Sequence, residues 1–254
     1  MIEVMSLDAL PAGFLILVGL AALGAFVYGI AGFGSGLVGI PLALHFHEAR
    51  LVLAVFALLD CVNVVRVLSS QPRLAVRQEV VRLVPACVAG LVVGSLLLLL
   101  IAPRPLMLLL GVFVLAYAAW SLRASGTLSA LGLRWAVPAG FSSGLTSSMF
   151  GIGGPPYVIY LVRRGLEPAA LRATMAATGL VSMGGRTLAF AAAGLLSDPA
   201  VWLTTAVALP ASLGSLLLAE RVRHRLSAVA TRRVIEWLLL LSGLSLEAKA
   251  GVWA

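Results

Sequence analysis

The sequence predicts an all-α protein integral to a membrane, with two inverted repeats that each hold four transmembrane helices and a short re-entrant half-helix. Three observations support this prediction. Of the 254 residues, 61% are hydrophobic and only 11% are charged, with a mean hydropathy of +1.08, whereas soluble domains carry roughly 25% charged residues. Apolar runs recur along the whole chain instead of forming one anchor. Two glycine-rich segments, 31–42 and 150–161, interrupt these runs in a matching way.

Eight apolar runs are long enough to form transmembrane helices. They cover about residues 10–30, 51–68, 80–101, 105–122, 135–150, 169–194, 200–219 and 233–247. Two shorter segments, 36–46 and 155–163, begin at the glycine-rich segments. At about 1.5 Å per residue, each covers about half of the ~30 Å hydrocarbon core, which predicts two half-helices. We expect the first run to stay in the mature chain, because residues 1–9 lack the basic region of a signal peptide.

The arginines predict the orientation of the chain, because cytoplasmic loops of membrane proteins are rich in Lys and Arg. The basic links lie near residues 69–79, 123–134, 165 and 226. The links near 103 and 197 and the amino terminus carry at most one arginine, and we place them outside. The links alternate between the two sides of the membrane only if each half-helix forms a hairpin with the long helix before it. Each hairpin then begins and ends on the same side of the membrane. The two halves are therefore predicted to be inverted copies, with both termini outside.

An internal repeat supports this organisation. At an offset of 119 residues, Gly32 and Gly34 match Gly151 and Gly153, and at an offset of 120, Arg66 matches Arg186. Matched glycines and a matched arginine are not expected from a background of Leu and Ala. The predicted domains are a first transmembrane repeat over 1–122, a cytoplasmic linker over 123–134 and a second transmembrane repeat over 135–254.

The two glycine-rich segments, "AGFGSGLVGIPL" and "FGIGGPPYVIYL", predict broken helices at membrane depth. A broken helix leaves backbone groups that must be buried in protein or line a water-filled cavity, and secondary transporters hold their substrates at such breaks. Each half-helix begins at its break, so its free N–H groups and the positive end of its dipole face the midplane and favour an anion. The alternative is that the glycines only allow close helix packing.

The predicted substrate site joins both breaks with polar residues of the neighbouring spans. From the breaks it takes Gly34, Ser35, Gly36, Gly153, Gly154 and Pro155, and from the spans Asn63, Ser182 and Arg186. Glycine lets backbone amides approach a ligand, and proline fits the first turn of a helix. Polar residues inside a span usually mark a substrate or ion path. Asp60 is a candidate to carry a coupling proton, and the alternative is that it neutralises an arginine. Arg66 is either functional or extends to the membrane surface.

Other classes of function find little support in the sequence. The net charge of +8 comes from arginines in links, so no basic domain remains to bind nucleic acid. "GFGSG" does not fit the GxSxG pattern of a serine nucleophile, and we expect no enzyme. His45, His47 and Glu48 lack a further metal ligand, so no metal and no cofactor are expected. Cys61 and Cys87 lie in apolar runs as small hydrophobic residues.

The segments "GFGSG…P" and "GIGGPP…Y", spread over two four-span halves, resemble the TauE/SafE sulfite exporter and anion permease family. This resemblance implies transport of small anions, such as sulfite or organosulfonates, across a bacterial inner membrane. The predicted function is a secondary transporter that works by alternating access around a midplane site. An anion channel without ion coupling and a non-transporting membrane scaffold are the alternatives. The expected partners are a small anionic substrate and the lipid bilayer, while coupling protons and a homodimer stay open.

Overall fold

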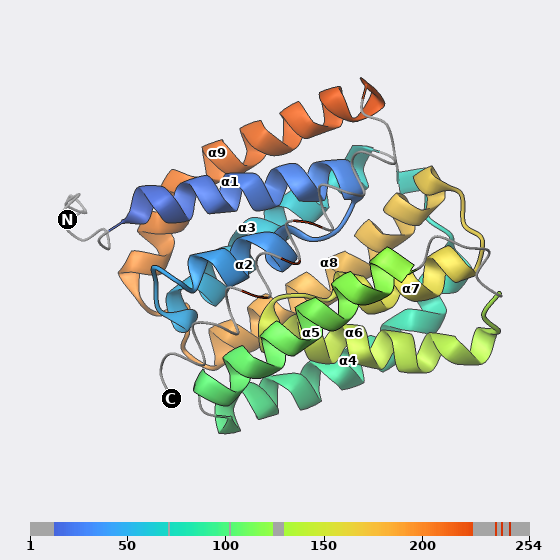
Figure 1. Cartoon of the computed structure of the whole chain (residues 1–254), viewed down its shortest axis with the longest axis horizontal. Coiled ribbons are helices and arrows are strands. Elements are labelled where there is room, and N and C mark those ends of the chain that lie inside the picture. Colours follow the sequence, from blue (N-terminus) through green and yellow to red (C-terminus); the bar gives the residue numbers. More distant parts are fainter. Residues whose placement is uncertain are drawn as a thin grey trace.

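The computed structural model describes residues 13–70, 72–101, 103–123 and 130–225, together with residues 237, 240 and 244. Within these ranges the regular structure is entirely helical (Figure 1). The long helices are α1 (Phe14–Ala31), α3 (Ala49–Ser70), α4 (Arg77–Leu100), α5 (Pro103–Arg123), α6 (Ala136–Phe150), α8 (Pro168–Ala192) and α9 (Pro199–Val222). The short ones are α2 (Ser35–Ala43), α7 (Gly154–Arg163) and the 3-10 turns η2 (Pro72–Leu74), η3 (Leu133–Trp135) and η4 (Arg223–Arg225).

The prediction of an all-α membrane protein is confirmed for the described residues. Four helices, α1, α3, α4 and α9, are long and apolar enough to cross a membrane. The predicted span over 233–247 lies outside the described residues, apart from positions 237, 240 and 244. The half-helix predicted over 36–46 ends earlier, at Ala43, because residues 44–47 form tight turns back onto the last helical carbonyls.

The helices pack into two bundles, and each bundle includes one helix from the other half of the sequence (Figure 1). The first bundle contains α1, α2, α3 and α9, and the second contains α6, α7, α8 and α4. Along one edge α1 lies beside α9, along the opposite edge α4 lies beside α6, and α3 packs against α8 between the bundles. The packing pattern is unchanged when α1, α2, α3 and α4 are exchanged in that order with α6, α7, α8 and α9.

Glycines bring α4 and α6 into unusually close contact. A Cβ atom at Gly144 would lie 2.0 Å from the carbonyl oxygen of Cys87, and one at Gly90 would lie 2.0 Å from that of Phe141. No side chain fits at such distances, so both positions require glycine. Small residues at a helix interface allow the two backbones to approach closely in a membrane. For this pair of helices, close packing accounts for the glycines.

Burial separates the central helix from the peripheral ones. In α3, 61% of the most apolar window is buried, against 28% in both α4 and α9. The exposed side chains of α4 and α9 are large and apolar, among them Val81, Val92, Leu96, Trp202 and Leu218. Such faces suit hydrocarbon rather than water. The bundles therefore expose lipid-compatible surfaces on their outer sides and keep α3 inside.

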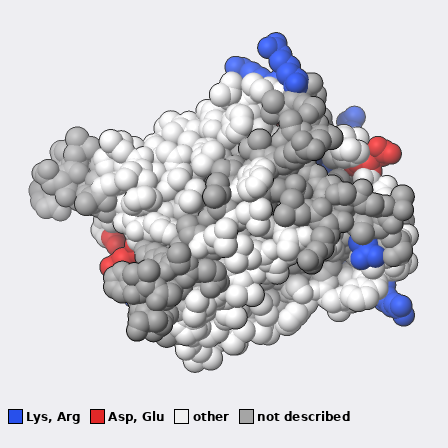
Figure 2. Space-filling view, viewed as in Figure 1, with Lys and Arg blue, Asp and Glu red and all other residues white. Residues whose placement is uncertain are grey.

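Charged residues collect at the ends of the helices. Figure 2 shows the visible basic side chains at the end of the molecule where α7 and α9 finish, whereas acidic side chains are visible at both ends. The described arginines at the basic end include Arg73, Arg77, Arg134, Arg163 and Arg223. Arg50, at the start of α3, lies at the other end. This asymmetry is the one that the positive-inside rule describes.

Candidate functional site

The two half-helices begin at the centre of the molecule and run in opposite directions (Figure 1). The preceding residues, Gly34 and Gly153, cap α2 and α7, and Gly34 has a φ of 96° that favours glycine. The two breaks touch each other. A Cβ atom at Gly36 would lie 2.5 Å from the carbonyl oxygen of Gly151. The structure thus brings together two helix amino termini that are far apart in the sequence.

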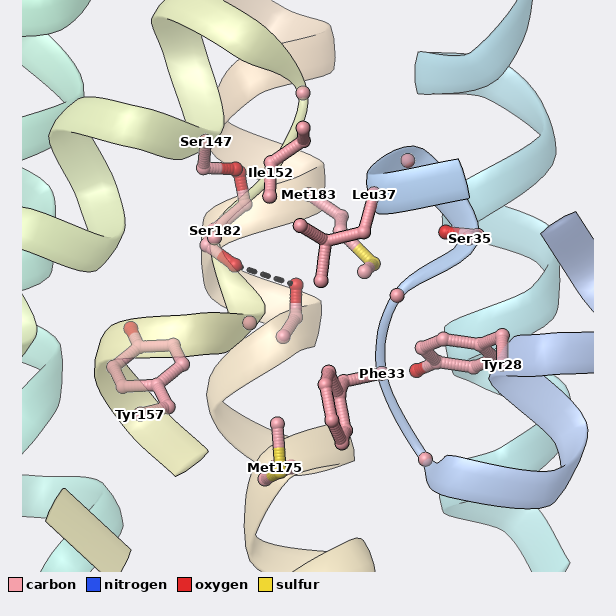
Figure 3. A pocket seen from close by; sticks show the side chains of 17 residues that line it. Tyr28, Phe33, Ser35, Leu37, Ser147, Ile152, Tyr157, Met175, Ser182 and Met183 are labelled. Carbon is pink, nitrogen blue, oxygen red and sulfur yellow. Dashed lines mark hydrogen bonds between the residues drawn. The ribbon is translucent and has the colours of Figure 1, made fainter. Parts of the chain in front are cut away.

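A pocket lies between these two amino termini (Figure 3). About 440 Å³ of space between its lining atoms is free of atoms, and part of that space is open to solvent. Its lining comprises Tyr28, Gly32, Phe33, Gly34, Ser35, Gly36, Leu37, Ser147, Gly151, Ile152, Gly153, Gly154, Tyr157, Met175, Gly179, Ser182 and Met183. None of these residues carries an ionisable acid or base of the Asp, Glu, His, Lys or Arg types. The described lining is therefore neutral, with hydroxyl groups beside apolar side chains.

Six of the predicted site residues line this pocket, and three do not. The lining residues are Gly34, Ser35, Gly36, Gly153, Gly154 and Ser182. Asn63, Pro155 and Arg186 lie outside the lining. Asn63 donates a hydrogen bond through Nδ2 to Ser212 Oγ at 3.1 Å, which joins α3 to α9 instead. Pro155 occupies the first turn of α7, where its missing N–H costs no helical hydrogen bond.

Ser35 connects the pocket to a buried ion pair. Its hydroxyl donates to Asp60 Oδ1 at 2.6 Å, and Arg186 Nη2 lies 2.9 Å from Asp60 Oδ2. Asp60 and Arg186 are only 2% and 1% exposed. A charge buried to this degree needs a partner, because an unpaired one is very costly. Asp60 and Arg186 therefore neutralise each other directly behind the wall of the pocket and tie α3 to α8.

The second break is held by α6. Ser143 Oγ donates a short hydrogen bond to the carbonyl oxygen of Gly153. Because C=O and N–H point in opposite directions across a trans peptide, this bond turns the N–H of Gly154 away from α6. Ser147, one turn further along α6, lines the pocket itself. Two serines of α6 thus fix the start of α7 and contribute to its surroundings.

Sequence reasoning missed three hydroxyl-bearing residues of the lining, Tyr28, Ser147 and Tyr157. Figure 3 shows Tyr28 and Ser35 approaching from α1 and α2, and Ser147 and Ser182 from α6 and α8. Tyr28 and Ser147 are matching positions at the repeat offset of 119, each four residues before a break glycine. This shared polar position ahead of each glycine-rich segment is the signal that could have revealed them.

Arg172, near the start of α8, lies beside the pocket and bonds to the end of α1. Its Nη1 donates to the carbonyl oxygens of Gly29 and Ile30, the latter at 2.8 Å. Its side chain also packs on Gly32, where a Cβ atom would lie 2.7 Å from Arg172 Cγ. The last carbonyls of a helix are unpaired and carry the negative end of its dipole. Arg172 satisfies those of α1.

The other polar residues named from the sequence lie away from the pocket. Arg66 pairs with Glu220 of α9 at 3.2 Å, with 40% of its side chain exposed. His45 and His47 lie near backbone carbonyls, those of Pro41 and Gly13, at 3.0 and 3.3 Å. Within the described part of the chain, no group of three or more metal-binding side chains is present.

Comparisons with known proteins agree with one another. The family model described as "Sulfite exporter TauE/SafE" matches residues 15–246. A protein of Cupriavidus necator named "Probable sulfite/organosulfonate exporter TauE" is 31% identical over 241 residues, covering 91% of this chain and 93% of that protein. A protein of Comamonas testosteroni named "Probable inner membrane transporter protein TsaS" is 30% identical over 166 residues, covering 65% of this chain and 69% of that protein. No solved structure matches the chain.

Proposed function

The chain belongs to the TauE/SafE sulfite exporter family, and from this premise we propose that it moves small sulfur-containing anions across a bacterial inner membrane. As a member of this family it is a membrane transporter and not an enzyme. The proposed substrates are sulfite and organosulfonates, which the name of the relative from Cupriavidus necator mentions. The name of the relative from Comamonas testosteroni supports the inner membrane.

One observation carries the proposal: two helix amino termini meet at a neutral, hydroxyl-lined pocket inside a bundle of apolar helices. Free N–H groups and the positive ends of helix dipoles bind anions. We assign the substrate-binding role to Gly34, Ser35, Gly36, Gly153, Gly154 and Ser182 of the lining. Pro155 fixes the first turn of α7, Arg186 holds Asp60 behind the pocket wall, and Asn63 joins α3 to α9.

For the mechanism we propose alternating access, in which the first bundle rocks against the second around this pocket. The packing that is preserved when the two halves exchange places supports two inverted repeats, over 1–122 and 135–254. The basic end of the molecule supports a cytoplasmic position for the linker at 123–134. Because α4 packs in the second bundle and α9 in the first, the units that move in this proposal are the two bundles and not the two sequence repeats.

Transport into proteoliposomes tests this function. Saturable uptake of radiolabelled sulfite, accelerated by unlabelled sulfite inside, is the expected result for a transporter. A flux that neither saturates nor responds to sulfite on the opposite side would favour a channel, and the absence of flux would favour a scaffold. Flux driven by a pH gradient would support a coupling proton, for which Asp60 is the candidate.

Two glycine variants give this assay a matched control. Gly36→Val places a side chain against the carbonyl of Gly151, where even a Cβ atom would lie at 2.5 Å, and should abolish uptake. Gly19→Val adds the same side chain on α1, where no atom beyond the neighbouring residues and backbone of its own helix lies within 4 Å, and should retain uptake. Equal uptake by both variants would place the substrate path elsewhere.

A further inference from the structure

The ion pair behind the pocket wall is neutral, which restricts the charge of the anion that fits. Behind the wall, Asp60 and Arg186 form an ion pair at 2.9 Å, so their formal charges cancel. Arg172, at the edge, directs its guanidinium to the carbonyl end of α1. The lining itself contains no charged side chain among the described residues. Among the described residues, therefore, no charged side chain is directed into the pocket toward a ligand.

The remaining positive potential comes from the two half-helices. A helix amino terminus acts as roughly half an elementary charge. The half-helices α2 and α7 have nine and ten residues, and both begin at the pocket. Together their termini correspond to about one positive charge. This potential balances a single negative charge and leaves a second one uncompensated in a place of low dielectric constant.

Uncharged donors complete the site. Tyr28 is 2% exposed, lines the pocket and, within the described part of the chain, its hydroxyl has no hydrogen-bond partner. In Figure 3 this hydroxyl points toward the interior of the pocket. Ser35 and Ser182 add hydroxyls from the first and second halves. Neutral donors orient oxygens without adding charge, and the Tyr28 hydroxyl is available to donate to an anion in the pocket.

We infer that the site selects singly charged anions, so that it binds bisulfite and organosulfonates and discriminates against the sulfite and sulfate dianions. This inference rests on the proposed function and specifies the charge of its substrate. It depends on the neutrality of the pair formed by Asp60 and Arg186. Removing only the negative member should therefore change the preference of the site toward doubly charged anions.

The first test uses the unaltered protein in detergent and measures binding calorimetrically. Methanesulfonate and sulfate have similar tetrahedral shapes but carry one and two charges. We expect methanesulfonate to bind at least tenfold more tightly than sulfate, with an affinity that changes little from mildly acidic to mildly alkaline pH. The apparent affinity for sulfite should fall with rising pH as bisulfite loses its proton, by about tenfold per pH unit once the dianion predominates.

Variants of the ion pair provide the second test. Asp60→Asn leaves the charge of Arg186 uncompensated and should raise the affinity for sulfate relative to methanesulfonate by tenfold or more. The double variant Asp60→Asn with Arg186→Gln is neutral again and should restore the native ratio. Removing one member of a buried pair is destabilising, so binding is measured on the monodisperse fraction. If Asp60→Asn does not fold, the pH series on the native protein decides.

The outcomes separate this inference from the proposed function. Equal affinity for methanesulfonate and sulfate, with sulfite binding that ignores pH, would overturn the charge selectivity and leave anion transport intact. Binding of neither anion, together with no uptake into proteoliposomes, would overturn the proposed function itself. Tighter methanesulfonate binding without a change of ratio in Asp60→Asn would contradict the role assigned to the ion pair and would overturn the electrostatic argument.

Discussion

Ser35 has two possible partners, which makes it the most informative single residue of the site. It lines the pocket, and its hydroxyl donates to Asp60 at 2.6 Å. A bound anion competes with Asp60 for the same hydrogen. Ser35 thus links occupancy of the pocket to the pair formed by Asp60 and Arg186 between the two bundles.

We predict that Ser35→Ala weakens anion binding by about tenfold, because a hydrogen bond to a charged group contributes about 1.5 kcal/mol or more. Ser148→Ala is the matched control, since among the described residues that buried hydroxyl bonds only to the carbonyls of Gly144 and Leu145 in its own helix. Calorimetric titration with methanesulfonate measures both. An unchanged Kd in Ser35→Ala would remove this hydroxyl from the site.

A second pair of variants tests Tyr28. Tyr28→Phe should weaken methanesulfonate binding by about fivefold, the equivalent of about 1 kcal/mol, and should leave thermal stability unchanged. Tyr160→Phe removes a hydroxyl that donates to Glu79 at 2.8 Å outside the pocket, so it should lower stability and spare binding. The reverse pattern in calorimetry and thermal melts would show that Tyr28 is structural.

At the scale of the element, the breaks could be predicted because their cause is local. Glycine and proline in a short apolar segment interrupt a helix wherever it packs, and α2 and α7 begin within one residue of the predicted positions. The partner of Arg186 could not be predicted in this way. The sequence shows that Arg186 lies deep in its span. Whether its guanidinium faces the pocket or Asp60 depends on how α3 and α8 pack. Tyr28 was missed because α1 reads as uniformly apolar.

The contact between α4 and α6 gives a prediction at this scale. Gly144→Ala places a Cβ atom 2.0 Å from the carbonyl oxygen of Cys87 and should destabilise the protein by about 1–3 kcal/mol. Gly214→Ala, in α9, meets no atom within 4 Å beyond the neighbouring residues and backbone of its own helix, and it should be neutral or stabilising by up to about 1 kcal/mol. Thermal unfolding in detergent compares the two. Equal melting temperatures would contradict the close approach of α4 and α6.

At the scale of the whole molecule, the arrangement of helices departs from the simplest reading of the sequence. The repeat suggests two successive units, yet α9 packs with α1 and α4 packs with α6. Sequence patterns do not reveal this exchange, because helices that face lipid and protein on different sides are apolar all round. Packing between helices therefore had to come from the structure.

We predict that α9 moves with the first bundle during transport. Spin labels at Leu218 and Leu15 report the distance between α9 and α1, and labels at Leu218 and Val137 report the distance between α9 and α6. All three side chains are exposed. In a background where Cys61 and Cys87 are replaced, substrate should leave the first distance unchanged and shift the second, as measured by double electron–electron resonance. A shift in the first distance alone would mean that α9 moves with its own repeat.

The exchange of α4 and α9 also bears on how the chain is made. During synthesis, α4 emerges before its neighbour α6, and α1 waits for α9 until almost all of the described chain has been translated. Contacts of such wide sequence separation form late. Neither half can complete its bundle by itself, so insertion into the bilayer precedes assembly, and the two halves mature together or not at all.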